Sequence, residues 1–224
     1  MEKIKKENKV LHTYTAKEEK FNVISHICGV ILGIVAIVLF SKTAIKHQNL
    51  YGLISGVVFG ISTILLYAMS SIYHGLKPNT KAKKTFQIID HCSIFILISG
   101  AYTPFALCIL REDNQVFGWT ILSIIWAVSI IGIILNIKDL KKYRKISMFC
   151  YLAMGWSAII KINVLFSYLG KVGSILLVTG GVIYSIGAIF YALGKKYKWM
   201  HLIFHIACLL ASFLHMLCVL FYIL

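Results

Sequence analysis

Residues 172–193 read VGSILLVTGGVIYSIGAIFYAL, and residues 200–222 read MHLIFHIACLLASFLHMLCVLFY. Neither stretch contains a lysine, arginine, aspartate or glutamate, whereas the short connection between them, GKKYKW, carries three lysines. About 20 consecutive apolar residues suffice for a helix to cross the hydrocarbon core of a bilayer. The two stretches therefore predict a pair of membrane-crossing helices joined at the water interface.

Five more apolar runs of similar length precede this pair, near residues 22–40, 51–73, 87–110, 117–136 and 147–168. The runs are continuous and lack the two-residue alternation of barrel strands, which favours helices. The composition agrees, since 59% of the residues are hydrophobic and the mean hydropathy is +0.82. We predict an all-α integral membrane protein, a seven-transmembrane-helix bundle over residues 21–224, after a cytoplasmic basic tail over residues 1–20.

The basic residues predict the orientation of this bundle. Of the 23 lysines and arginines, 18 fall in the tail and in the second, fourth and sixth connections, and five fall on the other side. Cytoplasmic loops carry an excess of these residues, which predicts a cytoplasmic N-terminus and an external C-terminus. The net charge of +15 then reflects topology and contact with anionic membrane lipids. A nucleic-acid partner is not expected, because no soluble domain gathers the charge.

Four ionisable side chains lie at similar depth in this arrangement, although they belong to three different helices. At 1.5 Å per helical residue, His74 and His201 lie about 5 Å from the nearest lysine boundary, and Asp90 and His205 about 9–10 Å. Ionisable groups inside a membrane are costly and indicate a functional site. The coincidence of depth predicts that these residues converge.

The histidines have the pattern of a metal site. His201 and His205 are four residues apart and share a helix face, which is the spacing of zinc-binding helices. With His74 they would make a three-histidine site, and Ser70 lies one turn before His74 on the same face. The alternative is a set of interfacial histidines with no ligand. For Asp90 the alternative is a carboxylate that merely caps the third helix.

The remaining intramembrane histidines are weaker candidates. His215 lies about 25 Å from the lysine boundary, too far to share the ion, and is expected to make a packing contact or hydrogen bond. His91 follows Asp90 directly and points about 100° away, toward a neighbouring helix. His26 has a compatible depth and is a reserve candidate for a supporting role.

Three motifs carry a resemblance to a known family: Ser70-Ser-Ile-Tyr-His74, Phe86-Gln-Ile-Ile-Asp90, and His201-Leu-Ile-Phe-His205 with the later His215. In order and at matching depth, they resemble the hemolysin III family of the progestin and adipoQ receptor superfamily, over roughly residues 18–220. The resemblance implies a Zn²⁺ ion held by His74, His201 and His205. It also implies that Asp90 contacts the water on the metal and that Ser70 lies close by.

Two classes of function follow, with membrane lipids as the expected partners and the bacterial cell membrane as the expected location. The first is a zinc-dependent intramembrane hydrolase of a lipid amide or ester, with catalytic roles for Asp90 and Ser70. The alternative is a non-enzymatic hemolysin III-type cytolytic or receptor-like protein whose zinc is structural. A closed site would need a fourth protein ligand, which Asp90 could supply. A channel or transporter would need polar residues across the whole bilayer, whereas here they gather on one side.

Overall fold

The structure is a computed structural model, which describes residues 14–194 and 196–224 of the 224-residue chain. Every regular element among these residues is helical. The elements follow in the order α1 (Ala16–Lys46), α2 (Leu50–Gly75), α3 (Lys81–Phe105), the π-helical turn η1 (Ala106–Leu110), α4 (Arg111–Asp113), α5 (Gln115–Trp156), the 3-10 turn η2 (Ser157–Lys161), α6 (Ile162–Leu193) and α7 (Met200–Tyr222).

Most of the long helices begin at a residue whose side chain caps the first turn. The side chains of Asn49, Thr80 and Asn114 accept hydrogen bonds from the first turns of α2, α3 and α5. Thr15 caps α1 in a capping box with Glu18. Such residues satisfy backbone N–H groups that have no partner inside the helix. Short polar residues before each apolar run therefore determine where these helices start.

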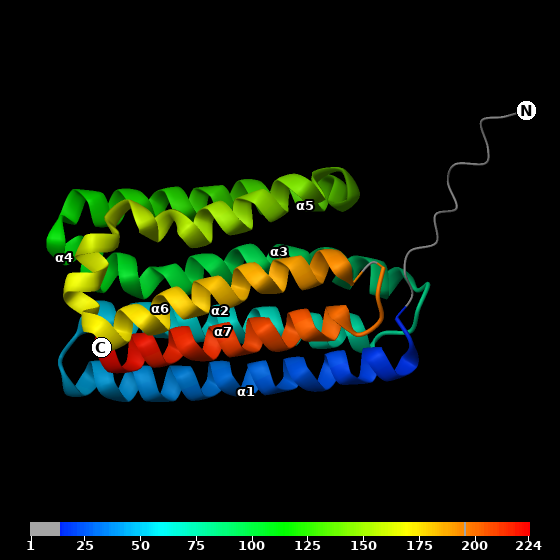
Figure 1. The fold of residues 1–224 in the computed structure, drawn as a ribbon, viewed down its shortest axis with the longest axis horizontal. Helices are drawn as coiled ribbons and strands as arrows, with labels where there is room; N and C mark the ends of the chain where they lie inside the picture. The colour runs from blue at the N-terminus through cyan, green and yellow to red at the C-terminus, as the bar shows by residue number, and fades with distance from the viewer. Residues whose placement is uncertain (1–13, 195) are drawn as a thin grey trace, which may run out of the picture.

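The helices lie roughly along one long axis (Figure 1). α1 packs on α2 and α7, α6 packs on α7, and α3 lies between α2 and α5. The contact between α1 and α2 is close at two glycines. A Cβ atom added to Gly60 would lie 3.0 Å from the carbonyl oxygen of Gly33 and 2.2 Å from a side-chain carbon of Ile37. Only glycine at this position allows the two backbones to approach so closely.

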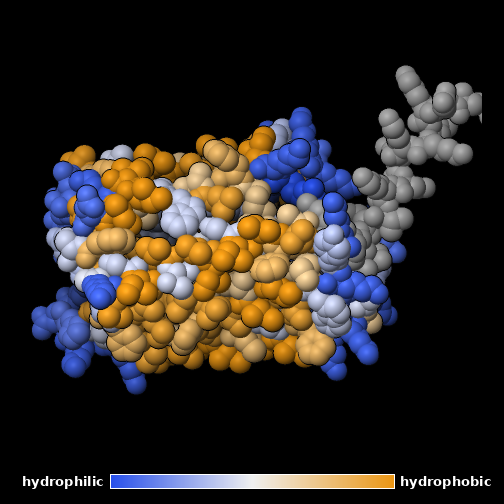
Figure 2. All heavy atoms as spheres, in the orientation of Figure 1, coloured by the Kyte–Doolittle hydropathy of each residue, from blue (hydrophilic) through white to orange (hydrophobic). Residues whose placement is uncertain are grey.

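The outer surface supports the membrane prediction. Large apolar side chains are exposed along all the long helices except the largely buried α3, among them Ile31, Ile61, Ile134, Ile189 and Ile206. Figure 2 shows these apolar residues as a broad band, with hydrophilic residues gathered at the two ends of the molecule. Exposed apolar surface of this extent is unsuited to water and fits the hydrocarbon of a bilayer.

The prediction of seven separate transmembrane helices is wrong. Within the described residues, five helices are long and apolar enough to cross a membrane: Ala16–Lys46, Leu50–Gly75, Lys81–Asp113, Gln115–Leu193 and Met200–Tyr222. The runs predicted at 117–136, 147–168 and 172–193 all lie in the fourth of these, a single helical segment of 79 residues.

This long segment changes direction without a conventional loop. Asp139 has non-helical dihedral angles (φ −163°, ψ 93°), and the Ser147 hydroxyl donates to Asn136 Oδ1 at 2.7 Å. In a straight helix, these residues would be about 16 Å apart, so α5 doubles back on itself (Figure 1). The basic stretch predicted to be a connection consists largely of good helix formers, and one non-helical residue suffices to turn it. η2 and Gly170 (φ 61°) interrupt the segment again before the body of α6.

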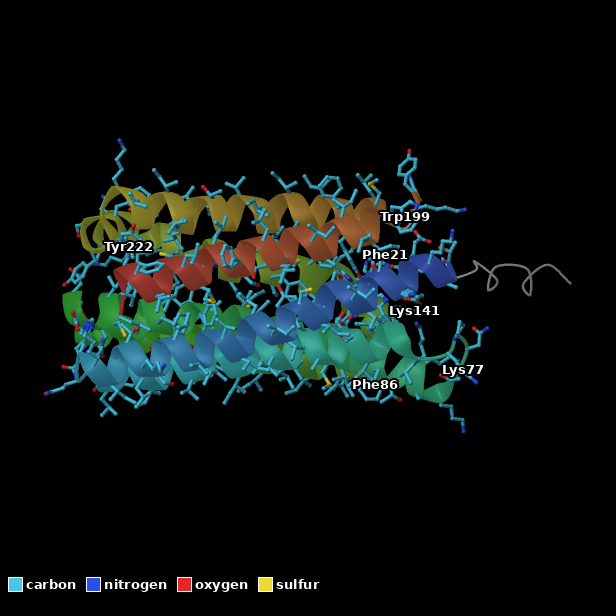
Figure 3. The ribbon with its side chains drawn as sticks, turned by 90° about the horizontal axis from the view of Figure 1, so that it is seen from below. Phe21, Lys77, Phe86, Lys141, Trp199 and Tyr222 are labelled. Atoms are coloured by element: carbon cyan, nitrogen blue, oxygen red, sulfur yellow. The ribbon has the colours of Figure 1, made fainter. Side chains whose placement is uncertain are left out.

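Basic connections gather at one end of the bundle. Lys77, Lys141 and Trp199 lie near this end, and Tyr222 lies at the other (Figure 3). The assignment of this end to the cytoplasm stays a prediction. Of the predicted tail, residues 1–13 lie outside the described residues, and Ala16 to Lys20 already form the first turn of α1.

Candidate metal centre

Three histidines converge at the end of the bundle where α2 ends and α7 begins. His74 is at the end of α2, and His201 and His205 are in the first two turns of α7. All three are buried. The Nε2 atom of His201 lies 3.3 Å from Nε2 of His74 and 3.0 Å from Nε2 of His205. The structure therefore brings together the three residues in which the sequence predicts a metal site.

The spacing of these nitrogens fits a tetrahedral metal ion. Bonds of about 2.0–2.1 Å at tetrahedral angles place two ligand nitrogens about 3.3–3.4 Å apart. The three candidate ligand atoms all lie within 4.8 Å of one another, and among the described residues no carboxylate or cysteine joins the group. The buried triad can therefore bind a metal and would leave a fourth position for a small ligand.

The carboxylate of Glu19 contacts His74 at Nδ1, the ring nitrogen that does not face the other two histidines. Its Oε2 atom lies 2.5 Å from His74 Nδ1, and its Oε1 atom lies 2.6 Å from Lys83 Nζ. A carboxylate accepts only, so the His74 proton is on Nδ1, and Nε2 presents its lone pair to the other histidines. The sequence analysis missed Glu19. Its only signal was a pair of acidic residues in the segment that was predicted to be a cytoplasmic basic tail.

Two more residues from the N-terminal side lie close to the triad, Tyr14 against His201 and Glu18 beside the start of α7. Tyr14 stacks on His201 with a ring-centroid distance of 4.7 Å and an interplanar angle of 18°. Burial raises the pKa of the Tyr14 phenol. Glu18 Oε1 accepts the backbone N–H of Trp199 at 2.7 Å, directly before α7.

Asp90 and Ser70 lie beside the triad rather than in it. Both are buried, and both line the same cavity as His201 and His205. Asp90 Oδ2 lies 3.5 Å from His91 Nδ1. The alternative that Asp90 caps the third helix is wrong, because Thr80 caps α3 and Asp90 is ten residues further along. A direct metal bond from Asp90 is also unsupported, since it is outside the group of candidate ligands in the described residues.

The other histidines have separate roles. His26 packs edge-on against His205 at 3.8 Å between centroids, and its Nε2 atom lies 3.4 Å from the Ser70 hydroxyl. His91 points to α6, where its Nε2 atom lies 3.1 Å from the Tyr191 hydroxyl. His215 Nε2 donates to the Leu177 carbonyl at 3.2 Å. His215 is thus hydrogen-bonded away from the triad, as its depth predicts.

A cavity of about 390 Å³ extends from the triad into the bundle. Its wall includes His201 at one end and His215 at the other, which are about 21 Å apart along α7. Most of its lining is apolar, and α5 and α6 contribute Tyr151, Trp156 and Gly181. Figure 2 shows the molecule hollowed between α5 and α6, on a flank covered by apolar side chains.

Comparison with known proteins decides the family. A family model described as haemolysin-III related matches residues 14–216. The chain belongs to the hemolysin III family. This family is part of the progestin and adipoQ receptor superfamily, and the motifs that indicated the resemblance all lie within the matched residues.

Two bacterial members of the hemolysin III family are similar over almost their whole length. "Hemolysin-3" of Bacillus cereus is 41% identical over 212 residues, which cover 95% of this chain and 94% of the relative. "Hemolysin-3 homolog" of Bacillus subtilis (strain 168) is 39% identical over 209 residues, or 93% of this chain and 96% of the relative. With the apolar helices described above, this similarity confirms the prediction of a multi-pass bacterial membrane protein.

Proposed function

We propose that this protein is a zinc-dependent intramembrane hydrolase that cleaves an amide or ester bond of a membrane lipid. The observation that carries the proposal is the position of the triad. Three histidine nitrogens that could bind a metal, with no fourth candidate protein ligand among the described residues, lie at one end of a mostly apolar cavity in the helix bundle. Catalytic zinc sites commonly have three protein ligands and an open position, whereas structural sites have four.

His74, His201 and His205 would hold the zinc ion. When bound, zinc supplies Lewis acidity that activates water at neutral pH and polarises a carbonyl group. Glu19 keeps His74 in the tautomer that such a ligand needs. Tyr14 shields one face of His201.

Asp90 is positioned to accept a proton from the attacking water. It is buried beside the triad, and its nearest neighbours include Ser70 and His91. An acceptor that is not itself a metal ligand keeps a free carboxylate oxygen for that proton. Ser70 also lines the cavity, and its hydroxyl would orient the substrate carbonyl by a hydrogen bond.

The cavity fits the tail of a membrane lipid. One leaflet of hydrocarbon is about 15 Å deep, and the cavity wall extends about 21 Å along α7, so one acyl chain can lie within it. Its volume of about 390 Å³ lies within the usual range of small-molecule sites. The hollow between α5 and α6 opens on the apolar flank, where a lipid would enter (Figure 2).

The test combines metal content with turnover in the purified full-length protein. Wild type should contain about one zinc per chain, and His205→Ala should contain little. His47→Ala should match wild type, because His47 is exposed and directly follows α1, which ends at the opposite end of the bundle from the start of α7 (Figure 1). Wild type should also cleave at least one member of a panel of lipid amides and esters. Metal-loaded wild type without turnover on that panel would favour the alternative, a cytolytic or receptor-like protein with a structural zinc.

A further inference from the structure

The two adjacent acids in the first turn of α1 contact the candidate metal centre on two different helices. Glu19 reaches His74 on α2, and Glu18 reaches Trp199 immediately before α7. We propose that Glu18 and Glu19 are positioning residues of the metal centre, Glu19 by orienting His74 and Glu18 by placing the start of α7 with His201. The inference depends on the metal site of the proposed function but not on hydrolysis.

Glu19 makes a partly buried bridge between three helices, α1, α2 and α3. Its carboxylate lies between His74 Nδ1 at 2.5 Å and Lys83 Nζ at 2.6 Å. Lys83 also donates to the His74 carbonyl at 3.4 Å, so both ends of the histidine are held. A metal-binding histidine whose other N–H donates to a carboxylate is fixed in orientation and becomes a better ligand.

Glu18 replaces a local cap for α7. The helix begins after Trp199, which has a left-handed conformation (φ 67°) and makes no side-chain cap bond among the described residues. Glu18 Oε1 accepts the Trp199 N–H at 2.7 Å, although the two residues are 181 positions apart. An acid at this point satisfies a backbone donor and favours the helix dipole. His201 is the second residue of this helix, so the contact positions its ligand atom.

The carboxylate of Glu18 is itself held rigidly. It is 3% exposed, and its Oε2 atom accepts from both the backbone N–H and the hydroxyl of Thr15 at 2.8 Å. Phe21 of α1 also packs against Trp199, with ring centroids 5.9 Å apart, and so adds a second contact between α1 and the start of α7 (Figure 3). Glu18 therefore fixes the start of α7 relative to α1.

The test uses Co²⁺ as a spectroscopic probe in detergent-solubilised full-length protein stripped of metal. Its visible spectrum depends on ligand geometry, which a merely structural role would leave unchanged. Glu19→Gln should weaken Co²⁺ binding about 10- to 100-fold, the usual effect of removing such a partner, and should alter the spectrum. Glu112→Gln is the matched control, because this half-exposed acid belongs to α4, which lies at the opposite end of the bundle (Figure 1).

Glu18 is tested by a pair of variants. Glu18→Ala removes the acceptor for Trp199 and should alter the Co²⁺ spectrum and weaken binding. Glu18→Gln retains one oxygen that can accept from Trp199 but loses the second acceptor, which holds Thr15, so it should restore part of the affinity. If Glu18→Ala does not fold, the inference is decided by Lys83→Met, which leaves both acids in place and should weaken binding less than Glu19→Gln does.

The outcomes separate this inference from the proposed function. Wild-type affinity and spectrum in both Glu19→Gln and Glu18→Ala would overturn the inference and leave the metal site standing. Equal weakening in Glu112→Gln would also overturn it, since the effect would then be general. Failure of wild type to bind Co²⁺ would overturn the inference together with the metal site. Selective weakening with a changed spectrum would support it.

Discussion

Replacing Asp90 by asparagine separates the roles that a buried carboxylate can have near a metal. Asp90 is 9% exposed as a residue, and its Oδ2 atom lies 3.5 Å from His91 Nδ1. Asparagine has nearly the same size and keeps one oxygen acceptor, so the packing against α2 stays. What changes is the charge and the ability to accept a proton.

The expected effects differ in size. Losing the contact with His91 costs about 0.5–1.5 kcal/mol, which the lower cost of burying a neutral group partly offsets. Metal affinity should change little, because Asp90 is outside the group of candidate ligands. A general base typically contributes 10²–10⁴-fold to the rate, or about 2.7–5.4 kcal/mol of activation free energy. The rate should therefore fall far more than stability or metal content.

The assay measures all three quantities on one preparation of Asp90→Asn and wild type. We expect similar zinc content, a small shift in the thermal midpoint in detergent, and turnover of the best lipid substrate reduced at least 100-fold. A parallel fall in zinc content and midpoint would mean that Asp90 binds the metal directly. A rate within threefold of wild type at full zinc content would refute the proton-acceptor role.

Three further predictions test the metal site, the helix packing and the cavity. Stripping and reloading with zinc should restore metal to His47→Ala but not to His205→Ala, as measured by metal analysis; equal loading would contradict the triad. Gly60→Ala should destabilise the protein by about 1–3 kcal/mol, because its new methyl group overpacks the α1–α2 contact. Gly155→Ala, which meets no atom within 4 Å, should be neutral or stabilising in the same thermal denaturation, and equal loss in both would contradict the packing argument. Gly181→Leu should fill the cavity near Trp156, raising KM for long-chain lipids more than for short ones while zinc content stays at the wild-type level.

The convergence of the histidines could be predicted because the lysine clusters mark the ends of the helices. Counting from Lys77 and Lys198 gives similar depths for His74 and His201, and the four-residue spacing of His201 and His205 places both on one face. The same count separates His215, which the structure places against the Leu177 carbonyl. One-dimensional distance along a helix was sufficient for these residues, since a bilayer aligns the helix axes.

The number of helices could not be predicted by the same reasoning. Charged stretches between apolar runs were interpreted as loops, but lysine, arginine and leucine are also good helix formers. Around Asp139 the chain stays helical on both sides of a single turned residue. Hydropathy locates where a chain is apolar and where it is charged. It does not reveal whether the backbone hydrogen bonds continue through the charged part.

The supporting carboxylates were missed for a different reason. Glu18 and Glu19 precede the first apolar run, where acids normally face water or cap their own helix, and Glu18 does cap α1 through Thr15. Their contacts to His74 and Trp199 depend on how α1 packs on α2 and α7, which the spacing of residues within α1 does not determine. Three observations explain why acids stand here: His74 needs a fixed tautomer, α7 begins after a left-handed residue, and the partly buried Lys83 needs a negative partner. Glu18 and Glu19 are neighbours on α1 and together meet all three needs. A shift of α1 would therefore move two of the three candidate ligands, His74 and His201, at the same time.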